Sequence, residues 1–215
     1  MKLAAHMSHM TIDEIMGRLV ALRSPNAFNP YSERCPVADL PHAPGIRRRN
    51  LELMLRAAAE TGVDEIWIAP EPTYRGARRT GLAMTDERHL QDHGQHFGVK
   101  GLQRATILPD PEEGTAGIVW SALAGIERRV FLWNTVPLHT HIAGNPFTLR
   151  RHNAAERNAS KPILDGIIDL LAPRRLVAVG YETAQALRRA GRDHEQVRHP
   201  ARRGARKFTA QVSNR

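Results

Sequence analysis

The hydrophobic pattern of the chain separates short apolar runs from longer amphipathic stretches. Three uninterrupted runs, EIWIA (65–69), VFLWN (130–134) and LVAVG (176–180), are each followed by turn residues. Runs of this kind are typical of parallel strands that are buried on both faces. Helical periodicity fills the segments between them. The pattern predicts a three-layer α/β/α fold whose mostly parallel central sheet has about four strands.

Several amphipathic stretches predict helices. In TIDEIMGRLVAL, Thr11 stands three residues before Glu14, which is the spacing of a capping box at a helix N-terminus. The stretch NLELMLRAAAETG predicts a second helix with Asn50 as its N-cap. Two further helices are expected in SKPILDGIIDLLAP, with Ser160 and Pro162 at its start, and in YETAQALRRAG.

The length of 215 residues is sufficient for one hydrophobic core. We therefore expect a single domain over residues 1–215, with an N-terminal helix (1–23), an irregular loop (24–46) and an α/β core (47–215). Hydrophobic residues make up 41% and charged residues 25% of the chain, which is the usage of a folded globular protein.

The charge balance indicates the kind of partner. Lys and Arg number 31 against 22 Asp and Glu, giving a net charge of +9, which attracts phosphate-rich partners. Nucleic acid fits best, acidic membrane surfaces come second, and a basic soluble enzyme is also compatible. A single cysteine excludes an internal disulfide, and no apolar run reaches the length of a membrane span. We expect a monomeric cytoplasmic protein without membrane contact, nucleoid-associated if its source is bacterial.

In open parallel sheets, ligands bind beyond the carboxyl ends of the strands. That rule directs attention to APEPTYRG after the first predicted strand and to NTVPLH after the second. Both segments carry polar residues directly after a buried run. The ligand site is therefore expected at this edge of the sheet.

Three motifs carry a resemblance to a known family. The stretch IAPEPTYRGARRTGLAMTDE resembles the first motif of the uracil-DNA glycosylase superfamily, FLWNTVP is similar to its strand ending in asparagine, and RHPARRG resembles its histidine-proline motif. They stand in the family's order between residues 64 and 208, so chance is a poor explanation. The resemblance implies a uracil-DNA glycosylase-like fold without the iron-sulfur cysteines.

The resemblance also implies an activity and its residues. It implies hydrolysis of the glycosidic bond of uracil in single- or double-stranded DNA, with free uracil as a product and with neither metal nor cofactor. Glu71 and His199 would be catalytic, and Asn134 would read the uracil edge, because an amide both donates and accepts hydrogen bonds. The remaining base-contacting candidates are Met84, Pro70 and Tyr74.

This chain departs from the family pattern around the base. Met84 stands where the family usually has a phenylalanine, and Pro70 has no N–H to donate. Thr73 replaces a tyrosine that excludes thymine in the best-known branch, and the adjacent Tyr74 is a candidate substitute.

Arginines cluster beside the motifs. Nine of the 28 residues from Arg188 onward are Lys or Arg, and the loop after His199-Pro200 contains arginines where the family has an apolar wedge. Arginine binds phosphates and stacks by its planar face, so we expect these side chains to contact DNA. The proposed contacts are Arg75, Arg78, Arg79, Arg198, Arg202 and Arg203.

Two other functions are compatible with the sequence. One is a metal-dependent nuclease or hydrolase that uses histidines of the set His89, His93, His96, His139 and His141. The other is a protein that binds uracil-containing or abasic DNA without efficient turnover, because the positions that depart from the family lie at the base.

Overall fold

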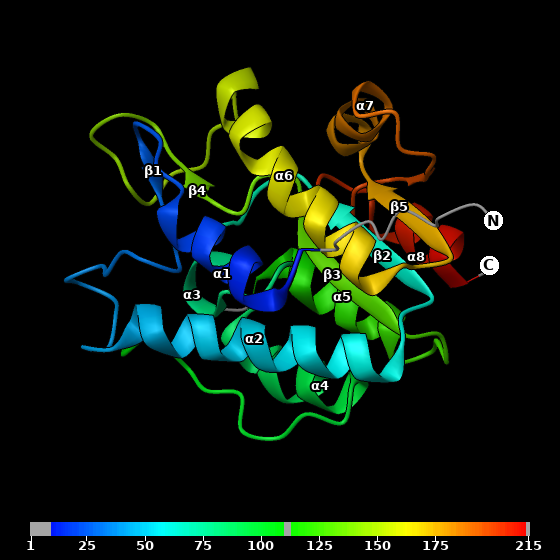
Figure 1. Ribbon diagram of the computed structural model, residues 1–215, viewed down its shortest axis with the longest axis horizontal. Helices are drawn as coiled ribbons and strands as arrows, with labels where there is room; N and C mark the ends of the chain where they lie inside the picture. Colours follow the sequence, from blue (N-terminus) through cyan, green and yellow to red (C-terminus); the bar gives the residue numbers. More distant parts are fainter. Residues whose placement is uncertain (1–9, 110–112, 214–215) are drawn as a thin grey trace, which may run out of the picture.

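The structure is a computed structural model that describes residues 10–109 and 113–213 (Figure 1). Four parallel strands form its main sheet in the order β3-β2-β5-β6. The strands are β2 (Glu65–Ala69), β3 (Val130–Asn134), β5 (Arg175–Val179) and β6 (Glu195–Val197), and a small antiparallel pair is formed by β1 (Ala27–Phe28) and β4 (His139–Thr140).

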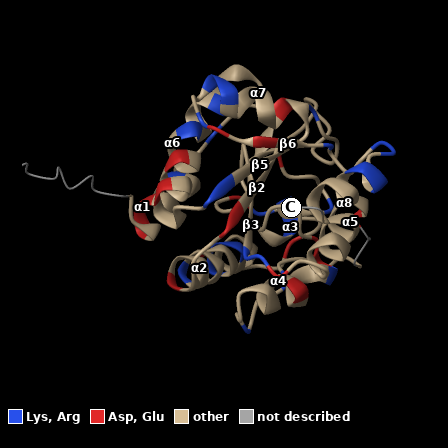
Figure 2. Ribbon diagram, turned by 90° about the vertical axis from the view of Figure 1, so that its right-hand side faces the viewer, with Lys and Arg blue, Asp and Glu red and all other residues tan. Residues whose placement is uncertain are grey.

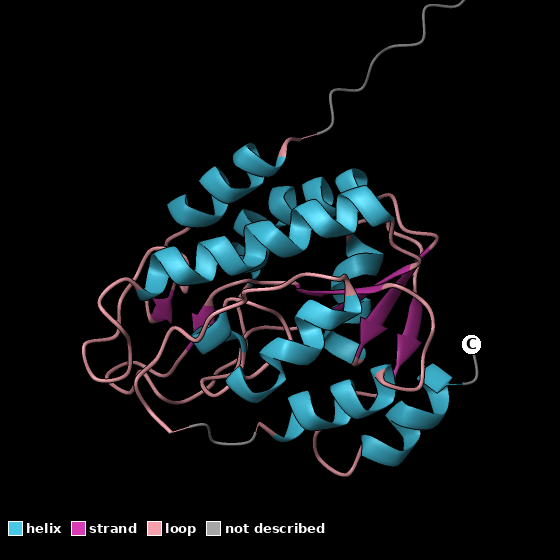
Figure 3. Ribbon diagram, turned by 90° about the horizontal axis from the view of Figure 1, so that it is seen from below, coloured by secondary structure: helices cyan, strands magenta, loops and turns pink. Residues whose placement is uncertain are grey.

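Helices cover both faces of the main sheet, which gives the expected three layers (Figure 3). Alternate residues of each strand point to opposite faces, so Ile66 and Ile68 join one core cluster while Trp67 and Ala69 join the other. The helices are α1 (Ile12–Ala21), α2 (Ala43–Thr61), α3 (Ala77–Thr80), the 3-10 turn η1 (Glu87–His89), α4 (Leu90–His96), α5 (Gly114–Leu123), α6 (Ala154–Leu171), α7 (Tyr181–Arg189) and α8 (Ala205–Ser213).

The two cores contain different helices. The first cluster buries side chains of α1, α2, α6 and α7 against one face of the sheet, and the second buries α5 and α8 against the other. Figure 1 shows α1, α2 and α6 together in front of the strands, with α5 and α8 behind them. None of the helices built by the described residues is long and apolar enough to span a membrane.

The first helix agrees with the sequence analysis. Thr11 caps α1 by accepting a hydrogen bond from the Glu14 N–H at 3.2 Å, and the Glu14 carboxylate accepts one from the Thr11 N–H at 2.7 Å. The two strands β2 and β3 also have the predicted bounds. The third run is shifted by one residue, because Gly180 ends the strand and caps α7.

Two predicted helix starts are wrong. Helix α2 begins at Ala43, so Asn50 lies inside it as a buried residue, where its amide donates to the Gln103 carbonyl and accepts from the Gln103 N–H. Helix α6 begins at Ala154, with Asn153 as its N-cap, and it continues through Pro162. Ser160 therefore lies in the helix interior rather than at the start.

The segment expected to be an irregular loop at 24–46 contains ordered structure. It includes β1 and the first residues of α2, and a buried ion pair between Arg47 and Asp39 at 2.5 Å holds the connection between them. Asp39 also accepts a hydrogen bond from the Cys35 N–H, and Arg47 donates to the Arg79 carbonyl. These bonds tie the segment to the loop that follows β2.

Candidate active site

Four of the predicted residues line one small cavity at the carboxyl ends of β2 and β3. Glu71, Met84, Asn134 and His199 all contribute to its wall, together with Thr73 and other residues of the loop after β2. The pairing of Ala69 with Asn134 in the parallel sheet brings the ends of the two strands to the same level. Residues separated by more than a hundred positions in the chain thus meet at the edge where parallel sheets bind ligands.

Asn134 is the last residue of β3 and is only 5% exposed. Among the described residues, none forms a hydrogen bond with its side-chain amide. A buried amide is normally satisfied within the protein, because burying an unpaired polar group is costly. The free donor and acceptor of Asn134 are therefore available to a ligand in the cavity.

Glu71 is held by a histidine that the sequence analysis did not identify. The Nδ1 atom of His152 lies 2.6 Å from Oε2 of Glu71, and both side chains are only 6% exposed. With Nδ1 protonated, His152 donates to the carboxylate and leaves Oε1 of Glu71 to face other partners. The pair has the geometry of a carboxylate oriented by an imidazole.

Hydrogen bonds of Arg150 anchor the segment that carries His152. Arg150 forms hydrogen bonds with both oxygens of the Glu156 carboxylate, at 2.6 and 2.9 Å, and it also donates to the His141 carbonyl. Burial alone would raise the pKa of Glu156, but hydrogen bonds from Arg150, Ser24 and Asn153 hold it at about 2. His152 thus stands between an anchored arginine and the capped start of α6.

His199 lies in the loop between β6 and α8, and its side chain is part of the cavity wall. Its Nδ1 atom accepts a hydrogen bond from the Ala201 N–H at 3.2 Å. Burial, followed by the positive charge of Arg198, lowers the pKa of His199. The ring is therefore neutral at pH 7 with its proton on Nε2, which makes Nε2 a hydrogen-bond donor.

Two glycines make room for the histidine loop. A Cβ atom on Gly204 would lie 1.9 Å from the His199 carbonyl oxygen, and one on Gly180 would lie 3.2 Å from the His199 Cβ. Gly180 also has a φ of 95°, which favours glycine. Arg202 and Arg203, in the tight turn between His199 and Gly204, both adopt left-handed φ values, 53° and 62°. Such strain in non-glycine residues is concentrated at functional sites.

Met84 lies at the cavity with a φ of 50° and is only 6% exposed. The cavity itself has a volume of about 30 Å³, enough for roughly two water molecules. A pyrimidine needs more space, so binding requires side chains of the wall to move. Met84 is suited to this because the thioether side chain is unbranched and flexible.

Two further polar residues of the cavity were missed by the sequence analysis. Glu113 and Thr115, at the start of α5, also line its wall. Glu113 caps α5 by accepting from the Ala116 N–H at 2.7 Å, and burial raises its pKa. The capping position next to GTAGIVW was the sequence signal for Glu113, but nothing in the sequence connected it to this cavity.

A larger groove of about 600 Å³ opens beside the cavity, and Glu71 and His199 line both. It runs between the start of α6, helix α7 and the turn after His199. Six arginines line it, and Figure 2 shows blue segments on α6 and α7. The arginines are Arg150, Arg151, Arg157, Arg189, Arg198 and Arg202.

Most of these arginines are available to an anion. Arg150 is paired with Glu156 and Arg151 with Glu182. The other four make no ion pair with any acidic residue in the described part of the chain. The groove therefore combines a recessed carboxylate and imidazole with an unneutralised positive surface, as phosphate-rich ligands require.

The six arginines predicted to contact DNA fall into three pairs: two line the groove, two are exposed outside it and two are buried. Arg198 and Arg202 line the groove, whereas Arg75 and Arg203 are exposed outside its wall.

The prediction for Arg78 and Arg79 is wrong, because both side chains are only 3% exposed. The Arg78 guanidinium lies 4.3 Å from the ring centre of Phe28 and 5.2 Å from that of Phe147, and Arg79 donates to the Pro109 carbonyl and the Tyr74 hydroxyl. Both arginines brace the loop from within.

Two of the predicted base-contacting residues lie outside the wall of the cavity. Tyr74 packs on Phe147 at a ring-centre distance of 4.9 Å and is not part of the cavity wall, where Thr73 stands instead. Pro70 lines the groove rather than the cavity. Both residues follow β2 closely in the sequence, but neither lines the small cavity.

The histidines predicted as candidate metal ligands each bind a different group of the protein. His93 binds the Thr85 hydroxyl, His96 accepts from the Val130 N–H, and His139 contacts the Pro72 carbonyl. Within residues 10–109 and 113–213, no three His, Cys, Asp or Glu side chains are grouped as metal ligands.

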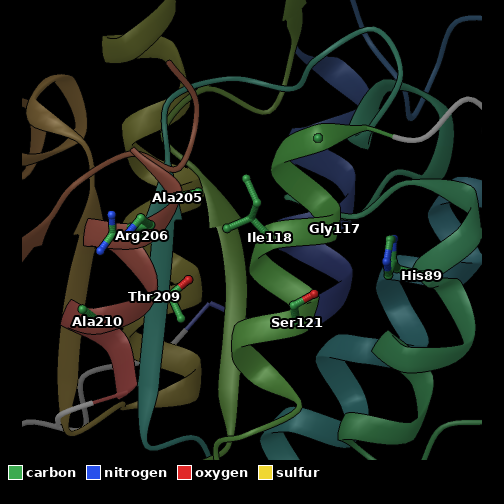
Figure 4. Close-up of a pocket in the computed structure, with 9 residues that line it drawn as sticks. His89, Gly117, Ile118, Ser121, Ala205, Arg206, Thr209 and Ala210 are labelled. Atoms are coloured by element: carbon green, nitrogen blue, oxygen red, sulfur yellow. The ribbon is translucent and has the colours of Figure 1, made fainter. Parts of the chain in front are cut away.

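A second groove, of about 840 Å³, lies between α5 and α8 (Figure 4). Its wall consists mainly of small residues such as Gly117, Ser121 and Ala210, with Arg206 at one side. It contains none of the residues of the cavity described above. The chemistry of the molecule therefore concentrates at the carboxyl ends of the strands.

The fold and the site together define an α/β protein of the uracil-DNA glycosylase type of fold, with a recessed carboxylate, amide and histidine beside a basic groove. The structure is similar to the crystal structure of wild-type SMUG2 from Pedobacter heparinus, a member of that superfamily, with a TM-score of 0.59 over 97% of each chain. The two sequences are 12% identical, so the likeness concerns the fold. No family model and no curated protein matches the sequence.

Proposed function

We propose that this protein is a DNA glycosylase that releases uracil by hydrolysing the bond between the base and deoxyribose. The observation that carries the proposal is the unpartnered amide of Asn134, a residue only 5% exposed that ends β3 and lines the cavity. Uracil presents neighbouring N–H and C=O groups, and one amide side chain satisfies both. Cytosine presents the opposite pattern, so an amide held in the orientation that fits uracil would be left unpaired by cytosine, which disfavours it. The fold likeness to SMUG2 supports the same class of reaction.

In the proposed reaction, negative charge develops on the base and positive charge on the sugar as the bond between them breaks, and the site stabilises both charges. A water molecule attacks C1′ of the sugar, the C1′–N1 bond breaks, and its electron pair stays on the uracil ring. His199 donates from Nε2 to the base and stabilises the negative charge that develops there. Glu71 stabilises the positive sugar and accepts the proton of the attacking water through Oε1, because His152 occupies Oε2.

The position of the cavity requires the base to leave the helix. A sugar bond inside a duplex is inaccessible to a recessed carboxylate, so the nucleotide must be extruded toward the site. The groove is the place for the flanking strand, since its free arginines neutralise phosphates on either side of the extruded residue. Arg198 and Arg202 flank His199 and grip the strand nearest to the reacting bond.

The test is an incubation with a labelled oligonucleotide that contains one uracil, followed by alkali to cleave abasic sites. We expect cleavage at the uracil only after alkali, in the presence of a strong chelator, and no cleavage of an oligonucleotide with cytosine at that position.

Two outcomes of the test contradict the proposal. Cleavage without alkali that stops with chelator would identify a metal-dependent nuclease. Tight binding to uracil-containing DNA without alkali-sensitive product would identify a binding protein.

A further inference from the structure

One aromatic side chain stands unpartnered inside the basic groove. Tyr181 is 67% exposed and is part of the groove wall. Within the described residues, its hydroxyl has no hydrogen-bond partner and its ring no aromatic contact. Exposed tyrosine rings offer a large flat apolar face at low entropic cost, so a ring in this setting is suited to contact a ligand.

The backbone fixes this ring beside the reaction centre. Tyr181 is the first residue of α7 and directly follows Gly180, whose Cα lies against the His199 side chain. Gly180 donates its N–H to the Val197 carbonyl at 2.9 Å, which anchors the turn to β6. Helix α7 buries Thr183, Ala184 and Leu187 in the protein, and this packing holds the start of the helix, and Tyr181 with it, next to the His199 loop.

The turn that follows the catalytic histidine provides no apolar group to support a disturbed base stack. Ala201, Arg202, Arg203 and Gly204 form it, and the alanine methyl is its largest apolar side chain. Extruding a nucleotide leaves its neighbours without a stacking partner, which costs free energy unless a side chain replaces it. An aromatic face among arginines is the combination that proteins use to hold single-stranded bases.

We infer that Tyr181 stacks on a base of the bound DNA strand adjacent to the extruded nucleotide. The inference rests on the proposed function, because it places that nucleotide in the cavity next to His199. Free arginines of the groove hold the phosphates of the same strand while the ring holds the base. Leu149 is 46% exposed in the same groove, but its aliphatic side chain has no π-face on which a base could stack.

The experiment compares binding to oligonucleotides that carry a tetrahydrofuran abasic analogue at the uracil position, so that no bond is cleaved. In a second set, the base on the 5′ or the 3′ side of the analogue is also replaced by tetrahydrofuran. The wild-type protein should bind one of these second substrates about 10-fold more weakly or worse, because a stacked base is lost. For Tyr181→Ala, removal of the same base should change binding by no more than about twofold.

Three controls separate stacking from other effects. Tyr181→Trp should keep the dependence on the neighbouring base, since it keeps a π-face. Ile142→Ala removes an exposed apolar side chain that lies outside the groove, where Ile142 is 55% exposed. This variant should bind both sets of oligonucleotides as the wild-type protein does. Tyr181→Ala should also keep the salt dependence of binding, because no phosphate contact is removed.

The outcomes also distinguish this inference from the proposed function. An equal loss in wild type and Tyr181→Ala on removing either neighbour would overturn the assignment of the stacking role, and so would a loss that disappears only in Leu149→Ala. If the wild-type protein still releases uracil from DNA in that case, the glycosylase proposal stands and the failure belongs to Tyr181 alone.

Discussion

Replacing His152 by alanine removes the hydrogen bond that orients the Glu71 carboxylate. The bond joins Nδ1 and Oε2 at 2.6 Å between side chains that are each 6% exposed, so water replaces it poorly. A hydrogen bond to a charged group contributes about 1.5–3 kcal/mol net. If that contribution orients the carboxylate for the attacking water, its loss slows the cleavage step by about 10- to 150-fold.

The assay is the single-turnover rate of uracil release with enzyme in saturating excess, so that binding does not limit the rate. His152→Ala should be slow, while its affinity for DNA stays near that of wild type. His152→Gln keeps an N–H donor on the side chain and should recover part of the rate. Circular dichroism and thermal unfolding of both variants confirm that the fold is retained.

A double-mutant comparison provides the refutation. In a Glu71→Gln protein the carboxylate is already absent, so the further change of His152 to alanine should alter the rate little. If the His152→Ala protein cleaves at the parental rate, the histidine does not orient Glu71 in the reaction. A change confined to DNA affinity would instead assign His152 to phosphate binding in the groove.

Four further outcomes are expected. Asn134→Asp should lose most activity on uracil in the alkali assay, because the carboxylate lacks the amide's donor, and full retention would place Asn134 outside recognition. His199→Ala should slow single-turnover cleavage by about 10²-fold with little change in DNA affinity, and a parental rate would make the histidine structural. Arg202→Ala should weaken DNA binding and reduce its salt slope in titrations from low to high salt, whereas an unchanged slope would remove Arg202 from the phosphate contacts. Burial lowers the pKa of His93 to about 3 from 6.5, so only the unfolded chain takes up a proton between these values. The free energy of unfolding should therefore fall as pH drops below 6.5, by about 1.4 kcal/mol per pH unit for this group, and urea titrations of His93→Gln should show a smaller slope.

The strands and the main site residues were readable from the sequence for a physical reason. β2 and β3 are buried on both faces, so their apolar runs are uninterrupted and their ends are sharp. In a parallel sheet the residues after such runs meet at one edge, and Glu71 and Asn134 do so. The glycines and the proline around His199 marked the tight turn that carries it.

The helix starts show where local patterns mislead. The N-terminal half of α2 reads as polar because of its arginines, yet Arg47 is buried through an ion pair with Asp39. For α6, the pair Asn153 and Glu156 has the spacing of a capping box, whereas Ser160 and Pro162, which predict a later start, lie inside the helix. In the folded chain, tertiary packing stabilises the helix on both sides of the proline.

Other parts of the site depend on long-range contacts that a sequence pattern does not contain. His152 meets Glu71 across 81 positions, and its own neighbours in the chain are arginines and an asparagine, which read as a polar loop. Arg78 belongs to a basic run typical of a surface, but aromatic rings from two distant segments enclose it. Only the folded chain decides which charged residues face the groove.

The most direct test of the central claim is a measurement of free uracil released by the wild-type protein from DNA under single-turnover conditions. We expect one uracil per uracil-containing strand, an equal number of alkali-sensitive sites, and loss of both in a Glu71→Gln, His199→Ala double variant that still binds the DNA. Absence of free uracil while the protein remains folded and bound to the DNA would contradict the claim that the cavity beside β2 and β3 is a glycosylase site.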